Sequence, residues 1–210
     1  MSGHQPTLPH PNPDSDPQPT MPPSSPIHIG VLLLPPVQLL DVSPIDLFGM
    51  LTPSYLASTP LPGPILAGAV PITISYIAPQ GAGSLASCTA SANLRIDAGF
   101  DDASVAPGKL EILMIPGPEP KAETDERAKR FIRAHVEGGG VTLMTVCTGC
   151  LPAARAGVFK GKKVTGPRGL LGGLKKEFPD TEWIDKRWTR DGRVWSSGES
   201  VSAFLDQSVK

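Results

Sequence analysis

The most constraining feature of the sequence is the run GGGVTLMTVCTGC at residues 138–150, which predicts a buried strand followed by a sharp turn and a helix. Residues 141–146 are largely apolar and β-branched, with glycines before them and the turn-forming pair Thr148-Gly149 after them. This order places Cys147 at the turn, where free N–H groups and the positive end of a helix dipole favour a thiolate. We therefore predict a nucleophilic Cys147 with a lowered thiol pKa. The alternative interpretation is that Cys147 is merely a small apolar residue that ends a core strand.

Strands and helices alternate along the rest of the chain, which predicts an α/β sandwich with a doubly wound, mostly parallel sheet between helices. In such a fold the functional site lies at the carboxyl ends of the strands. A helix is expected from Asp41 to Leu51, and another is expected after an N-cap at Thr124 and before a stop at Gly138. The expected strands are residues 27–34, 72–78, 110–115, 141–146, 163–165, 182–188 and 193–197, with 87–96 as an edge hairpin arm and 191–192 as a hairpin turn.

Composition sets the domain organisation and the compartment. Residues 1–26 hold nine prolines and almost nothing to bury, so we expect a disordered tail before a single α/β domain at 27–210. No signal peptide or membrane-spanning run is apparent, and an odd number of cysteines (three) fits a reducing compartment, so a cytoplasmic location is expected. A net charge of -1 gives no reason to expect a nucleic-acid or membrane partner.

Four segments together resemble the DJ-1/PfpI superfamily of class I glutamine amidotransferase-like proteins, and within it the isonitrile hydratase-like branch, which has many fungal members. They are LLDVSPIDLF at 39–48, IPG at 115–117, VCTG at 146–149, and the hairpin from KRW at 186–188 to WSSG at 195–198. The resemblance spans about residues 27–198. It implies a flavodoxin-like fold, a homodimer, and a reactive cysteine beside an acidic side chain.

The resemblance maps Cys147 onto the nucleophile, Thr148 onto the residue after it, and Asp41 onto the acidic partner. A carboxyl group at a neighbouring strand end is also the obvious proton donor on chemical grounds; the alternative for an aspartate there is a helix N-cap, and the two roles are compatible. Asp46 is the weaker candidate for the donor.

Beside these catalytic candidates, we expect Gly117, Gly149 and Arg168 to bind a small-molecule substrate, with neither a metal nor an organic cofactor. Arg168 could meet an anionic or polar group of the substrate.

Three departures from the family pattern matter. All four histidines precede Cys147, so a Cys-His dyad is not expected, and His135 is predicted to be packed. Pro118 has no N–H to offer an oxyanion, so Thr148 and Gly149 are the expected backbone donors. We do not expect the family's long closing helix, because this sequence has only Glu199 to Lys210 after the Ser-Gly strand end.

The predicted function is therefore cysteine-dependent hydration of a small electrophile, most concretely of an isonitrile to an N-substituted formamide. Glyoxalase or deglycase chemistry on carbonyls uses the same thiolate, and a non-catalytic redox sensor or chaperone is the rival from a different class. Cys147 and Cys150 form a C-x-x-C pair, so redox activity is a further alternative, although Cys150 is predicted to be a core residue. Trp188 and Trp195 are predicted to pack.

Overall fold

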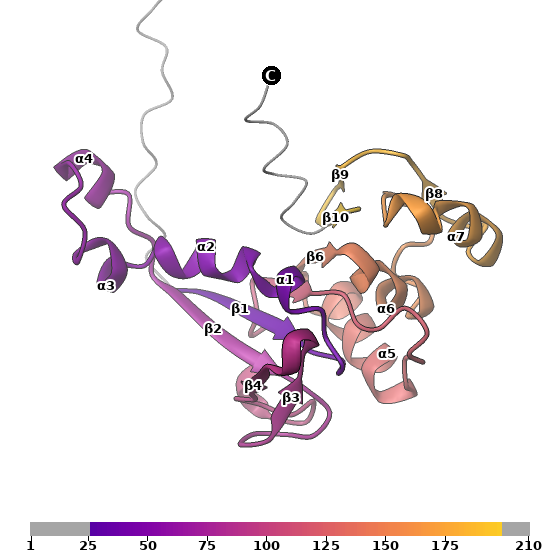
Figure 1. Cartoon of the computed structure of the whole chain (residues 1–210), viewed down its shortest axis with the longest axis horizontal. Coiled ribbons are helices and arrows are strands. Elements are labelled where there is room, and N and C mark those ends of the chain that lie inside the picture. Colours follow the sequence, from indigo (N-terminus) through magenta and orange to yellow (C-terminus); the bar gives the residue numbers. More distant parts are fainter. Residues whose placement is uncertain (1–25, 199–210) are drawn as a thin grey trace, which may run out of the picture.

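The computed structural model describes residues 26–198, and at its centre lies a six-stranded sheet with helices on both faces (Figure 1). The strand order is β2-β1-β5-β6-β10-β9, and every neighbouring pair is parallel except the β9–β10 hairpin. The predicted doubly wound α/β fold is confirmed. Its strands are β1 (Ile27–Leu32), β2 (Ile72–Ile77), β5 (Ile112–Ile115), β6 (Thr142–Val146), β9 (Trp188–Asp191) and β10 (Val194–Ser197).

Two apolar clusters fill the two faces of the sheet. Figure 1 shows α1 and α2 lying along β1 and β2, where Val42 and Ile45 pack with Ile29. On the opposite face, Phe131 of α5 and Leu151 of α6 belong to a second cluster. The central strands are therefore buried on both sides, which explains their nearly continuous apolar sequences. The helices are α1 (Leu39–Val42), α2 (Pro44–Met50), α3 (Pro53–Leu56), α4 (Gly63–Leu66), α5 (Glu126–Arg133), α6 (Cys150–Arg155) and α7 (Leu171–Glu177).

The helix predicted at residues 41–51 is two helices, because α1 ends at Val42 and α2 begins at Pro44. A proline is well suited to the first position of a helix but has no N–H with which to continue an earlier one. Ser43 lies between the two helices, and its hydroxyl donates a hydrogen bond to the Leu40 carbonyl at 2.6 Å.

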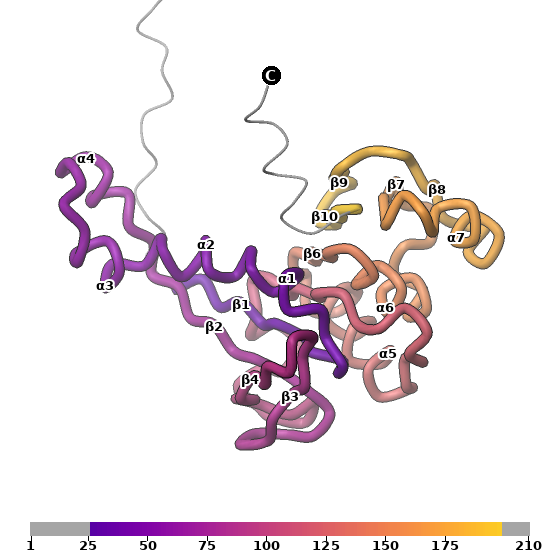
Figure 2. The backbone as a smooth tube through the Cα atoms, in the orientation of Figure 1, coloured from indigo at the N-terminus to yellow at the C-terminus, as the bar shows by residue number. Residues whose placement is uncertain are grey.

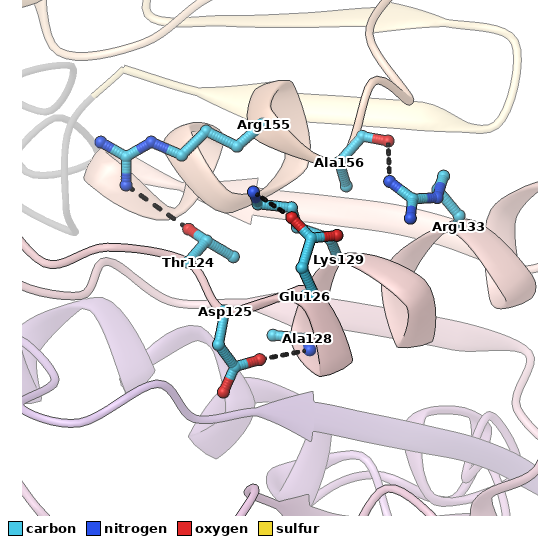
Figure 3. A network of polar contacts seen from close by, with 8 residues as sticks. All are labelled: Thr124, Asp125, Glu126, Ala128, Lys129, Arg133, Arg155 and Ala156. Atoms are coloured by element: carbon cyan, nitrogen blue, oxygen red, sulfur yellow. Dashed lines mark hydrogen bonds and ion pairs between the residues drawn. The ribbon is translucent and has the colours of Figure 1, made fainter.

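The predicted N-cap at Thr124 is wrong by one residue. The Asp125 side chain accepts the Ala128 N–H at 2.6 Å and begins α5, whereas the Thr124 hydroxyl accepts from Arg155 of α6 at 3.4 Å (Figure 3). A short π-helical turn, η3 (Ala134–Gly138), continues α5 to the predicted stop.

Two predicted strands are divided in the structure. Residues 87–96 do not form one edge arm: β3 (Leu85–Ser87) and β4 (Asn93–Arg95) pair with each other around the turn η1 (Thr89–Ser91), outside the main sheet. The 182–188 strand is also divided, because β8 (Glu182–Trp183) pairs with β7 (Lys163–Val164) while β9 pairs with β10. The hairpin turn at Asp191-Gly192 is confirmed, and Gly192 has a φ of 59°.

Residues 27–94 are poor in charged residue types, since Asp41 and Asp46 are the only Asp, Glu, Lys or Arg residues among them. Large apolar side chains are exposed along the same region, among them Leu40, Leu47 and Ile65. An open groove of about 660 Å³ runs between α1–α2 and β2. Figure 2 shows α3 and α4 at one end of the backbone, beyond the N-terminal end of β2.

Two more predictions concern the ends of the chain. Nearly all of the expected N-terminal tail, and the Glu199–Lys210 segment in place of a closing helix, lie outside the described residues. Within residues 26–198, no helix is long and apolar enough to cross a membrane. On the last hairpin, Trp188 and Trp195 stack on each other with ring centroids 5.8 Å apart, but Trp188 is 56% exposed, so its predicted packing is limited to this contact.

Candidate active site

Cys147 stands on a sharp turn where β6 ends. Val146 is still extended, but Cys147 has a φ of 54°, in the left-handed region that side chains rarely adopt. A 3-10 turn, η4 (Cys147–Gly149), then leads directly into α6. We call residues 146–149 the elbow. The predicted strand, turn and helix are all present, and the strained turn projects the Cys147 side chain from the carboxyl edge of the sheet.

The elbow is held by close backbone packing against the end of β5. A Cβ atom at Gly149 would collide with the carbonyl oxygen of Ile115, so no larger residue fits there. The Thr148 hydroxyl is buried and donates a hydrogen bond to the Pro118 carbonyl at 2.7 Å. Pro118 has no N–H, yet its carbonyl oxygen fixes the residue that follows the nucleophile.

Asp41 lies in α1 and faces the elbow across the β5 loop (residues 116–118). Asp41 is 1% exposed, and its carboxylate accepts the Gly117 N–H at 3.2 Å and a hydrogen bond from the Cys147 thiol. The alternative role of Asp41 as an N-cap is wrong, because Gln38 occupies that position and Asp41 is inside the helix. Burial raises the pKa of Asp41 to about 6, while the hydrogen bond from Gly117 opposes the shift.

The predicted lowering of the Cys147 pKa is wrong. Burial and the negative charge of Asp41 raise the pKa of the Cys147 thiol to about 11. The Thr148 N–H and the Gln38 amide lower it, as donors at a helix start should, but their effect is smaller. Cys147 and Asp41 therefore share one proton over a broad pH range.

Gln38 is a polar member of the site that the sequence interpretation missed. Its side-chain amide nitrogen lies 2.9 Å from the Thr148 hydroxyl and 4.0 Å from the Cys147 sulfur. Its position was a usable signal, because Gln38 follows the first strand and precedes Asp41 by three residues, which is one helical turn.

Gly117 is close to three side chains of this cluster. A Cβ atom there would overlap the Asp41 carboxylate, the Thr148 hydroxyl and the Gln38 amide. The absence of a side chain at this position therefore leaves room for the cluster to assemble. The structure thus brings together Asp41, Gly117, Cys147, Thr148 and Gly149 from the predicted set.

Arg168 has a different setting. It lies in the turn η5 (Arg168–Leu170) with its side chain 68% exposed, and its Nε donates to Asp185 at 2.8 Å. Its role in substrate binding stays a prediction. Asp46 is exposed on α2, in keeping with its weaker candidacy.

The remaining cysteines and histidines are accounted for elsewhere. Cys150 is fully buried, and burial raises its pKa to about 12. Cys88 is also buried, with a raised pKa. His135 is packed as predicted, with its ring nitrogens 2.8 and 2.9 Å from backbone carbonyls, and His28 lies at the start of β1 beside Ser75. Among residues 26–198, no three His, Cys, Asp or Glu side chains form a potential metal site.

A doubly wound sheet with a cysteine on a strand-to-helix elbow defines a class of α/β proteins in which a thiol stands at the carboxyl edge. Residues 62–210 match the family model of the DJ-1/PfpI family, and the chain therefore belongs to that family. The matched segment contains the β5 loop and the elbow, whereas Gln38 and Asp41 precede it. No curated protein matches the chain in sequence.

Solved structures share the fold at low sequence identity. A ThiJ/PfpI family protein from Pseudomonas syringae is 23% identical, with a TM-score of 0.66 over 95% of this chain and 72% of its own. Drosophila melanogaster DJ-1beta is 17% identical, with a TM-score of 0.63 over 86% of each chain. Schizosaccharomyces pombe DJ-1 is 14% identical, with a TM-score of 0.60 over 88% of this chain and 92% of its own. These similarities establish the fold and leave the reaction to be inferred from the site.

Proposed function

We propose that the protein hydrates isonitriles to N-substituted formamides, with Cys147 as the nucleophile and Asp41 as the proton carrier. The observation that carries this proposal is the hydrogen bond between the Cys147 thiol and a buried carboxylate whose pKa is about 6. Such a carboxyl group can accept a proton from sulfur and give it up again near neutral pH. The resemblance to the isonitrile hydratase-like branch supports the same substrate class.

In the first half of the reaction, the proton passes from Cys147 to Asp41 along their hydrogen bond. The resulting thiolate attacks the terminal carbon of the isonitrile and forms a sulfur–carbon bond. Asp41 then protonates that carbon, so that the thiol has added across it and a thioimidate is formed. A pair that has taken up a second proton cannot begin this step, so kcat/KM should fall below about pH 6.

In the second half, the Asp41 carboxylate takes a proton from a water molecule that attacks the thioimidate carbon, and it passes this proton on to the nitrogen. The adduct collapses, the carbon–sulfur bond breaks, and the hydroxyl proton returns to the sulfur as the formamide leaves. Water is the only co-reactant. The Thr148 N–H, which lowers the pKa of the thiol, would help to hold the adduct, while the lack of a side chain at Gly117 leaves room for Asp41, Thr148 and Gln38 beside it.

The positions of the histidines favour hydration over chemistry that needs an imidazole base. The two histidines within residues 26–198 are engaged away from Cys147: His28 beside Ser75, and His135 between two backbone carbonyls. Isomerisation of a dicarbonyl adduct also needs a base that moves a proton between adjacent carbons. The Asp41 carboxylate would then have to reach both carbons, whereas hydration requires it to protonate one.

The test is an assay of the purified full chain with an aryl isonitrile, in which the formamide is measured by chromatography. Wild type should form the formamide, and Cys147→Ser should abolish its formation. Asp46→Asn is the matched control for loss of a carboxylate, and it should retain activity because Asp46 is exposed. Consumption of methylglyoxal without any formamide would replace the hydratase assignment by the glyoxalase one.

A homodimer is part of this proposal. The charge-poor region 27–94 exposes apolar side chains and an apolar groove, and such surfaces mark contact sites on soluble proteins. Light scattering after size exclusion should give twice the mass of the 22.1 kDa chain. Leu47→Lys, which places a charge on the exposed face of α2, should shift the protein toward the monomer.

A further inference from the structure

The Gln38 side chain reaches the nucleophile from a backbone position that is itself fixed. Its N–H donates to the Gly117 carbonyl at 2.8 Å, so Gln38 is attached to the same loop whose N–H holds Asp41. Replacing the Gln38 side chain would therefore remove its side-chain contacts but leave this backbone hydrogen bond to Gly117 in place.

Thr148 determines which atom of the Gln38 amide faces the site. The Thr148 hydroxyl gives its only hydrogen to the Pro118 carbonyl at 2.7 Å, so its oxygen must accept at the other contact. The atom 2.9 Å away is therefore the amide NH₂ group and not its oxygen. One N–H of this group is used by Thr148, and the same nitrogen lies 4.0 Å from the Cys147 sulfur.

We propose that Gln38 is a catalytic residue whose second amide N–H stabilises the negative charge on the Cys147 sulfur. This rests on the proposed function only in that Cys147 is the nucleophile. When the thiol proton moves to Asp41, one negative charge moves from the carboxylate to the sulfur, and nothing else is exchanged. The sulfur then needs hydrogen-bond donors, and the Thr148 N–H and the Gln38 amide are positioned to supply them.

Gln38 and Asp41 would then act on the sulfur in opposite directions from the same turn of the chain. Asp41 stabilises the protonated thiol by its charge and by accepting the thiol hydrogen, and Gln38 stabilises the thiolate by donating one. Their balance decides how easily the proton crosses from sulfur to carboxylate.

The test is the pH dependence of iodoacetamide alkylation at Cys147, followed by peptide mass in the full chain. Gln38→Met keeps the length of the side chain and removes both N–H donors. It should raise the apparent pKa of Cys147 by about half a unit to one unit and slow alkylation at pH 8 by roughly threefold to tenfold. Gln80→Met is the matched control, since Gln80 is exposed after β2, and it should leave both quantities unchanged.

A role limited to packing would lower the melting temperature of Gln38→Met and leave the Cys147 pKa at its wild-type value, which would overturn the proposal. If Gln38→Met fails to fold, Gln38→Glu provides the same test with a side chain of nearly equal size, and it should raise the pKa further because it brings a negative charge. No change in the Cys147 pKa there would also overturn it. Alkylation needs no isonitrile, so a protein without hydratase activity could still show the shift.

Discussion

The elbow and the β1–α1 segment (residues 33–42) meet in one site but hold their reactive groups by different means. The elbow fixes Cys147 through the backbone: its φ is positive, and the next turn packs against the Ile115 carbonyl at Gly149. The β1–α1 segment presents Asp41 and Gln38 as side chains, each joined to its neighbours by hydrogen bonds. The elbow thus determines the position of the Cys147 thiol, and the β1–α1 segment determines the charge next to it.

This difference predicts that substitutions in the two regions affect different properties of the protein. A change that disturbs the backbone of the elbow should lower stability, because the packing there cannot relax without moving β5. A change in the β1–α1 segment should alter ionisation and turnover while the fold survives, because side-chain ends can move.

The largest effect is expected for Gly149→Ala. Its methyl group would meet the Ile115 carbonyl oxygen, a backbone atom that cannot rotate away, so the free energy of unfolding should fall by more than about 3 kcal/mol. Urea denaturation followed by circular dichroism measures this. Gly172→Ala is the control, since the helical Gly172 in α7 has open space around it and alanine should be neutral or stabilising. Equal stabilities for Gly149→Ala and wild type would remove the distinction between the two regions.

The next effect is the loss of chemistry in Asp41→Asn. The substitution keeps the side-chain size but removes the proton carrier of the proposed reaction, so formamide production should fall by about 100-fold or more. It also removes the negative charge that raises the Cys147 pKa, so the thiol should ionise at lower pH and alkylate faster than in wild type. Slower alkylation in Asp41→Asn would mean that Asp41 promotes the thiolate, and this would contradict a Cys147 pKa that the charge of Asp41 raises.

A smaller effect concerns the pH dependence of stability. The folded-state pKa of Asp41, about 6, lies above its ordinary value of 3.8, so ionising this carboxyl costs more in the folded than in the unfolded chain. Its contribution is therefore fully present below about pH 4 and lost as the pH rises through 6. Asp41→Asn should gain stability relative to wild type across this interval, by at most ~3 kcal/mol, as measured by urea midpoints at several pH values. A constant difference from pH 4 to 8 would contradict the raised pKa.

The smallest effect is expected for Cys150→Ala. Cys150 is fully buried in α6, so shortening it should cost about 1 kcal/mol of packing and leave turnover nearly unchanged. After mild peroxide, intact mass should show oxygen additions on both wild type and the variant. A reversible loss of two daltons that occurs only with Cys150 present would instead establish a Cys147–Cys150 redox pair.

The sequence was most informative where backbone conformation decides the structure. The apolar run before Cys147 and the glycines around it predicted the strand and the elbow, because both follow from local patterns. The same local reasoning predicted Gly138 as the end of the helical segment formed by α5 and η3, and it predicted the hairpin turn at Gly192. It failed where a proline divided one helix and where short strands chose partners far away in the sequence, as β8 did with β7.

Ionisation in the site could not be predicted in the same way. The helix start at Cys147 suggested a lowered pKa, but the outcome depends on burial and on how closely Asp41 approaches, which are set by the packing of α1 against the β5 loop. The role of Gln38 could not be predicted from the sequence for a related reason. Its role depends on the direction of its amide, and that direction is fixed by Thr148 and Pro118, more than 70 residues away in the sequence.

The left-handed backbone at Cys147 also shapes how the chain can change by mutation. Because a side chain in this conformation costs roughly 1 to 2 kcal/mol, glycine is the residue that would relieve the turn, and it would remove the sulfur at the same time. Random substitutions selected only for a more stable fold would therefore drift toward loss of the thiol. Stability and thiol reactivity therefore make opposite demands on this position, and a library of substitutions at residue 147 screened for both would separate the two demands.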